Sequence, residues 1–315
     1  MRLSDCHNID DFRQLARARL PWPVFDYIDG AADDELTKAR NTAAFENADL
    51  VPDVLAGVAE IDTSCTIMGR RTALPLMLSP TAVQRAFHWQ GETAVARAAE
   101  RFGLWFGISS LATRSIEEVA ALTGGPKLFQ LYVHKDKGLN ASMIERCQAA
   151  RFDALALTVD TIVSGKRERC LRSGFTTPPR FSASALWSYA TRPRWTLDYL
   201  LREQFRLPNL DTHVREGSGK AVSIAEYFNT MLDTSMDWDT AARIRQDWGG
   251  TFCLKGVMSA ADARRAVEIG ADAIMISNHG GRQLDGSRAP FDQLREIVDT
   301  VGGEIEIICD GGVRR

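Results

Sequence analysis

The stretch that decides the fold reads Ala273-Ile274-Met275-Ile276-Ser277-Asn278-His279-Gly280-Gly281-Arg282. Its apolar run predicts a buried strand over 273–278, of the kind that parallel sheets contain. The two glycines permit a close approach of the backbone, and a cation follows three residues after His279. An imidazole beside a guanidinium suits removal of a proton from a substrate that carries a carboxylate. The segment therefore predicts a catalytic site at the end of a strand.

Six more apolar runs alternate with helical segments along the chain. We predict strands at 74–79, 104–109, 128–133, 154–160, 251–256 and 305–310, with helices that include 91–102, 115–122, 139–151 and 259–269. Strands and helices that alternate in this way predict a parallel sheet wrapped by helices. Because the glycine fingerprint of a Rossmann unit is missing, a (β/α)8 TIM barrel is favoured over an open doubly wound sheet.

The length of the pattern and one long connection depart from a regular barrel. The sequence stops at Arg315, just after the seventh predicted strand, so we expect a barrel truncated after that strand. Roughly ninety residues separate the fourth strand from the fifth, where a handful is usual, which predicts a long insertion at about 175–240. Aromatic residues and arginines mix in it, a composition that suits a membrane interface or partner groove and equally a lid packed on the barrel mouth.

The first part of the chain reads as a preamble to the barrel. Residues 1–70 form a helical lead-in, in which Phe12, Leu15 and Ala16 have helical spacing behind an aspartate cap at Asp10. The acidic run 33–35 is predicted to be the first turn of another helix, where the helix dipole favours negative charge. Residues 1–315 are accordingly expected to form one domain.

Composition narrows the class of protein. Apolar residues make up 45% of the chain and charged residues 25%, which is typical of a globular domain. A net charge of -3 gives no whole-chain attraction for nucleic acid. The six cysteines form no C-x-x-C pair, so neither a metal site nor a disulfide framework is expected. The polar N-terminus and the absence of a membrane-length apolar run lead us to expect a cytoplasmic protein.

Small and polar residues end every predicted strand. A strand-end serine or threonine is most often a helix cap, and an Asp-Gly-Gly sequence is most often a turn. Their common position at the carboxyl ends of the strands predicts a shared site, because that is where barrels place reactive groups. The residues are Pro80, Thr81, Ala82, Ser109, Gln130, Tyr132, Thr158, Asp160, Lys255, Ser277, Asp310, Gly311 and Gly312.

Seven ordered motifs resemble the FMN-dependent α-hydroxy-acid dehydrogenases and oxidases, the family of glycolate oxidase, L-lactate dehydrogenase and mandelate dehydrogenase. The resemblance runs from about Asp10 to the last residue. The motifs are Asp26-Tyr27, Ser79-Pro80-Thr81-Ala82, Phe129-Gln130-Leu131-Tyr132-Val133, Leu157-Thr158-Val159-Asp160, Lys255-Gly256, the segment Ser277 to Asp285, and Asp310-Gly311-Gly312-Val313-Arg314-Arg315.

The resemblance implies a reaction and the residues that carry it. His279 is the implied base, and Asp160 orients it and stabilises its charge. The carboxylate of the substrate is held by Arg167 and Arg282, and Tyr27 and Tyr132 contact its carboxylate or hydroxyl end. An L-2-hydroxy acid, lactate- or mandelate-like, is oxidised to the 2-oxo acid, and the electrons pass to FMN. Whether His279 removes the C2 hydrogen as a proton or removes the hydroxyl proton stays open.

The same resemblance implies how FMN is held. The flavin lies against the backbone of Pro80, Thr81 and Ala82. Lys255 stabilises negative charge on the ring, and Ser277 also lines the cofactor. The ring is hydrogen-bonded by Ser109, Gln130 and Thr158, and the phosphate meets the loop that contains Asp310, Gly311, Gly312 and Arg314.

Two features of the sequence imply different electron acceptors. The stretch 192–198 resembles the insertion of mandelate and lactate dehydrogenases, which implies a membrane quinone and a peripheral position at the inner face of the cell membrane. Ala82 instead resembles the oxidases, which implies direct reaction with oxygen. Related barrels often assemble as tetramers, so a homotetramer is expected.

Two other readings of the chain stay open. The family completes its phosphate site with a Gly-Arg pair after the eighth strand, so one alternative is a truncated, inactive barrel remnant or a binding protein without flavin. Another phosphate-binding barrel, such as an aldolase, also fits the fold. It leaves the pairing of His279 with Arg282 without a role.

Overall fold

The computed structural model describes residues 2–175, 183–203, 205–210 and 230–315. Seven strands form one sheet in sequence order, and every neighbouring pair is parallel. The strands are β3 (Met77–Leu78), β4 (Trp105–Ser109), β5 (Lys127–Leu131), β6 (Ala154–Thr158), β7 (Thr251–Lys255), β8 (Ala273–Ile276) and β9 (Glu306–Cys309). Each overlaps a strand predicted from the sequence, so the predicted parallel sheet is confirmed.

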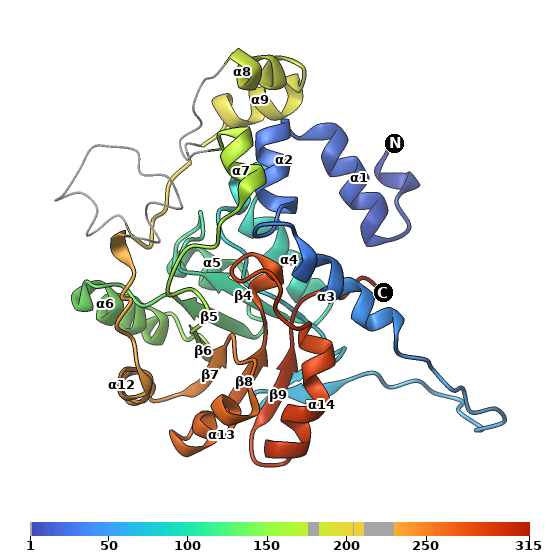
Figure 1. Ribbon diagram of the computed structural model, residues 1–315, viewed down its shortest axis with the longest axis vertical. Helices are drawn as coiled ribbons and strands as arrows, with labels where there is room; N and C mark the ends of the chain where they lie inside the picture. Colours follow the sequence, from blue (N-terminus) through green and yellow to red (C-terminus); the bar gives the residue numbers. More distant parts are fainter. Residues whose placement is uncertain (1, 176–182, 204, 211–229) are drawn as a thin grey trace.

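Helices follow the strands and lie around the sheet (Figure 1). They are α4 (Glu92–Arg101), α5 (Ile116–Leu122), α6 (Lys137–Ala149), α12 (Trp238–Trp248), α13 (Ala260–Glu268) and α14 (Pro290–Val301), with the 3-10 turn η2 (Gln84–Ala86) after β3. The sheet curls, and the Ser79 hydroxyl at the end of β3 donates to Asp310 Oδ2 after β9 at 2.9 Å. The architecture is a curled parallel sheet, consistent with a truncated β/α barrel.

Alternate residues of the strands pack into two separate cores. Phe106, Phe129 and Phe252 face the surrounding helices, whereas Trp105 and Leu128 belong to the cluster inside the curl of the sheet. This two-residue period is the ordinary alternation of side chains along a strand. All five side chains are almost fully buried, so both faces of the sheet are covered at these positions.

A hairpin that the sequence analysis did not predict closes the amino-terminal end of the sheet. It consists of β1 (Cys65–Ile67) and β2 (Arg70–Thr72), joined by a turn in which Met68 and Gly69 both have left-handed backbone angles. Two consecutive left-handed residues match the twist of a tight hairpin. Met68 packs into the inner core, and its N–H lies 2.8 Å from a carboxylate oxygen of Glu306 at the start of β9.

The first helices are η1 (Leu3–Asp5), α1 (Ile9–Arg19), α2 (Trp22–Asp29) and α3 (Leu36–Glu46). The predicted aspartate cap of α1 is wrong, because the Asn8 side chain accepts the capping bond from the N–H of Asp11. The acidic run 33–35 was also wrongly placed, since α3 begins only at Leu36. Its cap comes from Asp285, whose carboxylate accepts from the N–H groups of Leu36 and Thr37 at 3.3 and 2.8 Å.

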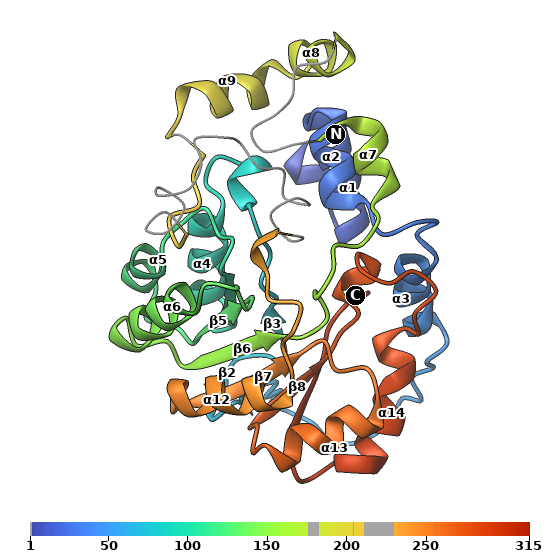
Figure 2. The ribbon, with the colours of Figure 1, turned by 60° about the vertical axis from the view of Figure 1, so that its left-hand side comes forward.

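The connection between β6 and β7 contains α7 (Glu168–Ser173), α8 (Ala183–Ala190) and α9 (Pro193–Leu201) ahead of α12. Parts of the predicted insertion, residues 176–182, 204 and 211–229, lie outside the described residues. Figures 1 and 2 show α8 and α9 at the end of the molecule that α2 and α7 occupy, away from the sheet. In the described ranges, no helix combines the length and apolar character needed to cross a membrane.

Candidate active site

Five neighbouring strands carry buried polar side chains at their carboxyl ends. The register places Ser109 opposite Gln130 and Thr158 opposite Lys255. Gln130 donates from Nε2 to the hydroxyl of Thr158, and Lys255 donates from Nζ to Ser277 Oγ at 2.9 Å. The structure therefore brings these five predicted residues together in one continuous row, because parallel strands end on the same side of the sheet.

Lys255 forms a buried ion pair at the centre of the site. Its Nζ lies 2.9 Å from Asp310 Oδ2, and Ser277 Oγ lies 3.2 Å from Asp310 Oδ1. Burial disfavours the ammonium, but the attraction of Asp310 and Asp160 and the hydrogen bond to Asp310 together outweigh it, so the pKa of Lys255 is raised. Burial alone would raise the pKa of Asp310, but attraction to Lys255 and the hydrogen bonds from Lys255 and Ser79 together lower it. Both groups are charged at neutral pH, which fixes a cation at the strand ends.

His279 occupies a backbone conformation that favours glycine. Its φ is 57°, and Gly280 and Gly281 follow at 67° and 74° within the 3-10 turn η3 (His279–Gly281). A β-carbon on Gly281 would lie 2.6 Å from the backbone nitrogen of Lys38, so no larger residue fits there. The left-handed conformation of His279 carries strain, and such strain is concentrated at functional sites.

Both nitrogens of the His279 ring have a partner. Nδ1 lies 3.1 Å from Asp160 Oδ1, and Nε2 lies 3.4 Å from the hydroxyl of Tyr132. A carboxylate can only accept, so Nδ1 carries the hydrogen and Nε2 presents its lone pair. Burial, followed by the charge of Asp160, raises the pKa of Tyr132, so this phenol stays protonated and can donate to Nε2. The arrangement is that of a base held by a carboxylate.

Asp160 is packed closely from its other side. A β-carbon on Gly256 would lie 2.7 Å from both Cβ and Cγ of Asp160, so the glycine after β7 makes room for the carboxylate. The second oxygen, Oδ2, is buried and has no hydrogen-bond partner among the described residues. This oxygen retains its capacity to stabilise positive charge on the neighbouring imidazole.

Two arginines converge on one side of the histidine. Arg167, at the start of α7, donates from Nε to the carbonyl of Arg282 at 3.2 Å. Both guanidinium groups lie over the ring of Tyr27, at 5.9 and 5.2 Å from its centroid. Burial, together with the charge of Arg167, lowers the pKa of Arg282 to about 10, so it is still a cation at neutral pH. Within the described ranges, neither arginine forms an ion pair with a carboxylate.

Gln283 is a site residue to which the sequence analysis assigned no role. Its Oε1 accepts from Arg167 Nη2 at 3.2 Å. Its Nε2 donates to the backbone oxygens of Val163 and Asp160 at 2.8 and 3.3 Å. The side chain thereby connects the arginine pair to the segment that holds Asp160. Its position next to Arg282 in the quoted motif was the available signal.

The residues predicted to bind the phosphate form fewer hydrogen bonds with the rest of the site. Gly311 and Gly312 have left-handed φ values of 102° and 86°, which lets their amides turn toward a common point. Arg314 is exposed, and its Nη1 bonds the neighbouring carbonyl of Val313 at 2.9 Å. On the opposite edge, Thr81 is exposed, and its hydroxyl accepts from Gln84 at 2.7 Å. The predicted residues at the two sheet edges meet through Ser79 and Asp310.

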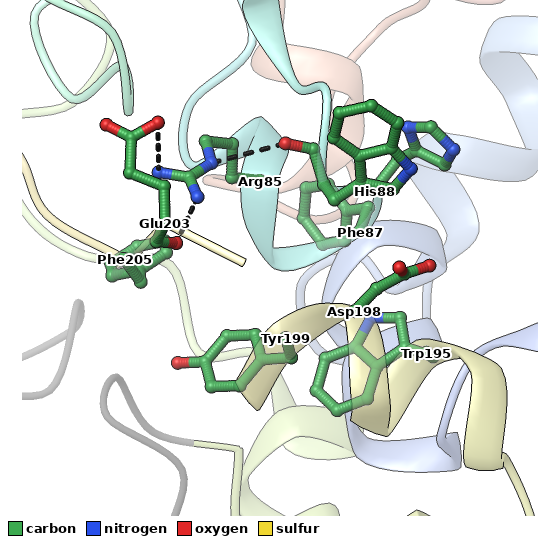
Figure 3. A pocket seen from close by; sticks show the side chains of 9 residues that line it. Arg85, Phe87, His88, Trp195, Asp198, Tyr199, Glu203 and Phe205 are labelled. Atoms are coloured by element: carbon green, nitrogen blue, oxygen red, sulfur yellow. Dashed lines mark hydrogen bonds and ion pairs between the residues drawn. The ribbon is translucent and has the colours of Figure 1, made fainter. Parts of the chain in front are cut away.

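A separate small cavity of about 40 Å³ lies beside η2 and α9 (Figure 3). Aromatic residues form much of its wall, and Figure 3 shows Arg85 reaching toward Glu203. Arg85 Nη1 lies 3.8 Å from a carboxylate oxygen of Glu203, and its Nε donates to the carbonyl of Trp89. The cation in this cavity is therefore neutralised, in contrast to the arginine pair beside His279. In the described part of the chain, no group of three histidine, cysteine or acidic side chains is placed to hold a metal ion.

A curled β/α sheet whose strand ends carry a histidine–aspartate pair and a buried lysine, with two arginines beside them, has the arrangement of a barrel enzyme. The family model described as FMN-dependent dehydrogenase matches residues 16–315, and the chain belongs to this family. Its members depend on FMN, so FMN is the cofactor of this enzyme.

Named relatives and a solved structure agree with this assignment. The chain is 37% identical over 313 residues to a putative L-lactate dehydrogenase of Mycobacterium tuberculosis, covering 99% of this chain and 74% of the relative. It is 39% identical over 312 residues to an L-lactate oxidase of Nostoc, covering 98% and 80%. The monotopic membrane protein (S)-mandelate dehydrogenase has a similar structure, with a TM-score of 0.91, 32% identity and coverage of 99% and 82%.

Proposed function

We propose that the chain oxidises an L-2-hydroxy acid, lactate- or mandelate-like, to the corresponding 2-oxo acid. The observation that carries the proposal is the pair of arginines, Arg167 and Arg282, which lack carboxylate partners in the described residues and adjoin the His279–Asp160 pair. Two cations without a carboxylate counter-ion, next to a base, fit a small anionic substrate with a removable proton. Relatives named for lactate and glycolate support the same substrate class.

Each residue then has a defined task. Arg167 and Arg282 hold the substrate carboxylate, and the ring of Tyr27 lies beneath both guanidinium groups. His279 receives one proton at Nε2, taken from C2 or from the hydroxyl. Asp160 stabilises the imidazolium through Nδ1, and Tyr132 orients the ring and the substrate oxygen. The two electrons and the second hydrogen that leave the substrate would be accepted by FMN when it is bound.

The residues at the strand ends fit this cofactor. Ser109, Gln130 and Thr158 supply buried hydroxyl and amide groups for the polar edge of the ring. The ammonium of Lys255, which is 4% exposed and paired with Asp310, suits a ring that gains negative charge. The backbone of Pro80, Thr81 and Ala82 would support the ring, and Ser277 would line it. The left-handed glycines Gly311 and Gly312, with Arg314, would receive the phosphate.

The outer side of α8 and α9 supports a membrane quinone as the electron acceptor. Trp187, Leu200 and Leu201 are 73%, 68% and 78% exposed there, and Arg192 and Arg194 begin α9. Exposed apolar side chains with adjacent cations fit the surface of an anionic membrane. We therefore place the protein peripherally at the inner face of the cell membrane. Ala82 keeps oxygen as the second candidate acceptor.

Anaerobic reduction of the bound flavin tests the proposed reaction. We expect the flavin absorbance to bleach on addition of L-lactate or (S)-mandelate, and the 2-oxo acid to form in equal amount. If no hydroxy acid of a panel bleaches the flavin, the proposed function is wrong. Mixing the reduced enzyme with oxygen or with a soluble quinone then identifies the acceptor by the faster reoxidation.

The role of His279 is tested separately. His279→Gln removes the base, so we expect the rate of flavin reduction to fall by a factor of about 10² to 10⁴ while flavin stays bound. His88→Gln is the matched control, because His88 is an exposed histidine stacked on Trp89, outside the site. Reduction by His279→Gln at the rate of the control would contradict the assignment.

A further inference from the structure

The segment 26–35, from the middle of α2 to the start of α3, contacts both arginines of the site, and we call it the hub. Its backbone bonds both arginine-bearing loops, because the N–H of Ala32 donates to Gly281 and the N–H of Asp33 donates to Lys166, each at 2.9 Å. Arg282 Nη1 donates in turn to the carbonyls of Tyr27 and Gly30, at 2.9 and 2.6 Å. The hub therefore sets the positions of the groups that hold the substrate.

The hub carries five carboxylates. Asp33 and Asp34 are exposed, and one arginine contacts the other three. Arg169 Nη2 lies 2.8 Å from Asp26, and its Nη1 lies 3.0 Å from Asp29 and 3.1 Å from Glu35. Burial opposes the charge of Arg169, but the hydrogen bonds to these acids outweigh it, so its pKa is raised. Charge-assisted bonds of this kind are among the strongest in proteins.

Two further cations balance the charge of these three carboxylates. Arg13 Nε lies 2.5 Å from Asp29, and Lys38 Nζ lies 3.3 Å from both Asp29 and Glu35. Three acids thus face three cations. In the described ranges, Asp26 has an ion pair with Arg169 alone. Removing Arg169 would therefore leave these three acids with one uncompensated negative charge.

We propose that Arg169 is a positioning residue for the substrate: it neutralises the three hub carboxylates that it contacts and so keeps Arg167 and Arg282 available to the carboxylate of the substrate. The physical reason is competition. An unpaired carboxylate in a partly buried site attracts the nearest mobile guanidinium and repels an incoming anion. The inference rests on the proposed function for the identity of the anion, and its test uses binding as well as turnover.

The test measures the affinity of the FMN-loaded protein for oxalate, a small dicarboxylate, by calorimetry. We expect Arg169→Met to weaken oxalate binding and to raise the KM for the hydroxy acid by about tenfold or more, with kcat changed by less than about threefold. Arg172→Met is the matched control. It lies on the same helix in an exposed pair with Glu168 at 2.6 Å, so we expect its affinity to match the unaltered protein.

A second substitution separates charge balance from simple packing. Asp26→Asn added to Arg169→Met removes one acid together with one cation, so that two acids again face two cations. We expect this double variant to recover most of the lost oxalate affinity. Asp26→Asn alone leaves two of these acids facing three cations, so it should bind oxalate at least as tightly as the unaltered protein. This single variant also decides the matter if Arg169→Met does not fold.

The outcomes distinguish this inference from the proposed function. Equal oxalate affinities for Arg169→Met and Arg172→Met would overturn it, as would a double variant that binds no more tightly than Arg169→Met. Weaker binding by Asp26→Asn alone would overturn it too. If the unaltered protein binds oxalate with the expected order of variants but no hydroxy acid bleaches its flavin, the proposed reaction fails and the role of Arg169 in anion binding holds.

Discussion

The side chains at the strand ends and those of the α8–α9 pair have opposite environments. At the strand ends, buried polar groups bond one another, as Lys255 does with Asp310 and Ser277. In α8 and α9, the rings of Tyr189, Trp195 and Tyr199 stack within the pair, and aliphatic side chains project outward. The first region is held by neighbouring strands, so its geometry is fixed. The second presents exposed apolar side chains and is suited to an external surface.

We expect the largest difference between the two regions in the rate of flavin reduction, when one carboxylate is removed from each region. Asp160→Asn replaces an acceptor by a group that can donate to His279 Nδ1, which favours the wrong tautomer of the ring. We expect flavin reduction to slow by about 10²-fold or more. Asp198→Asn, on α9, is the control. Stopped-flow reduction of both variants checks this, and similar rates would show that Asp160 does not orient the base.

The repeating pattern explains why the sheet could be predicted from the sequence. A buried parallel strand needs a nearly continuous apolar run, and all seven runs are local. The cap of α3 could not be found in this way, because Asp285 reaches it from about 250 residues along the chain. The acids at 33–35 look like a helix start, yet Glu35 has a left-handed φ of 61° and bonds Arg169 instead. Tertiary pairing overrides the local signal there.

The site shows the same division between local and distant information. His279, Lys255 and Ser277 were predictable, because strand ends converge in any barrel. The side-chain amides of Asn41 and Asn278 donate a hydrogen bond to each other, at 2.8 Å in each direction, and nothing in the sequence indicates this pairing. Nor does the sequence indicate the contact of Arg169 with the hub, since many surface helices contain arginines. Such pairings depend on how α2, α3 and α7 meet in three dimensions.

Stability should also separate a buried pair at the strand ends from an exposed one. Lys255→Met leaves the buried carboxylate of Asp310 without its cation, so we expect the free energy of unfolding to fall by about 3 to 5 kcal/mol. Lys166→Met breaks an exposed pair with Glu168 and should cost less than about 1 kcal/mol. Urea denaturation measures both. Adding Asp310→Asn to Lys255→Met should recover part of the loss.

A pH effect is expected where the long connection returns to the sheet. His134 is buried and forms an isolated β-bridge with Leu232. Its backbone N–H and carbonyl form hydrogen bonds with the side chain of Asn140. Burial lowers its pKa to about 4, whereas the unfolded chain takes up the proton near 6.5. The neutral imidazole of His134 therefore contributes its full share to the stability of the folded protein above pH 6.5, and this contribution is lost as the pH falls toward 4.

The pH effect can be assigned to one residue by comparing variants. We expect the free energy of unfolding to drop between pH 7 and 4.5 by on the order of 2 kcal/mol from this group. In His134→Gln this part of the drop should disappear, whereas His88→Gln should keep it. Identical pH profiles for the two variants would show that His134 is not responsible.

The smallest effect on the fold, and none on the chemistry, is expected on the outer side of α8 and α9. Leu200→Gln with Leu201→Gln replaces two exposed side chains, so the free energy of unfolding should change by less than about 0.5 kcal/mol per site. The rate of flavin reduction should be unchanged, because neither residue touches the strand ends. Retention by vesicles of anionic lipid should fall by on the order of tenfold, since two leucines no longer insert.

A matched control decides whether that loss reflects this surface or exposed leucines in general. Leu50, between α3 and β1, is even more exposed, and Leu50→Gln removes a leucine outside the helix pair. If Leu50→Gln lowers vesicle retention as much as the double variant does, membrane contact is not confined to α8 and α9. If only the double variant loses retention while both keep the full rate of flavin reduction, the catalytic strand ends and the outer helix pair are independent, as their different packing predicts.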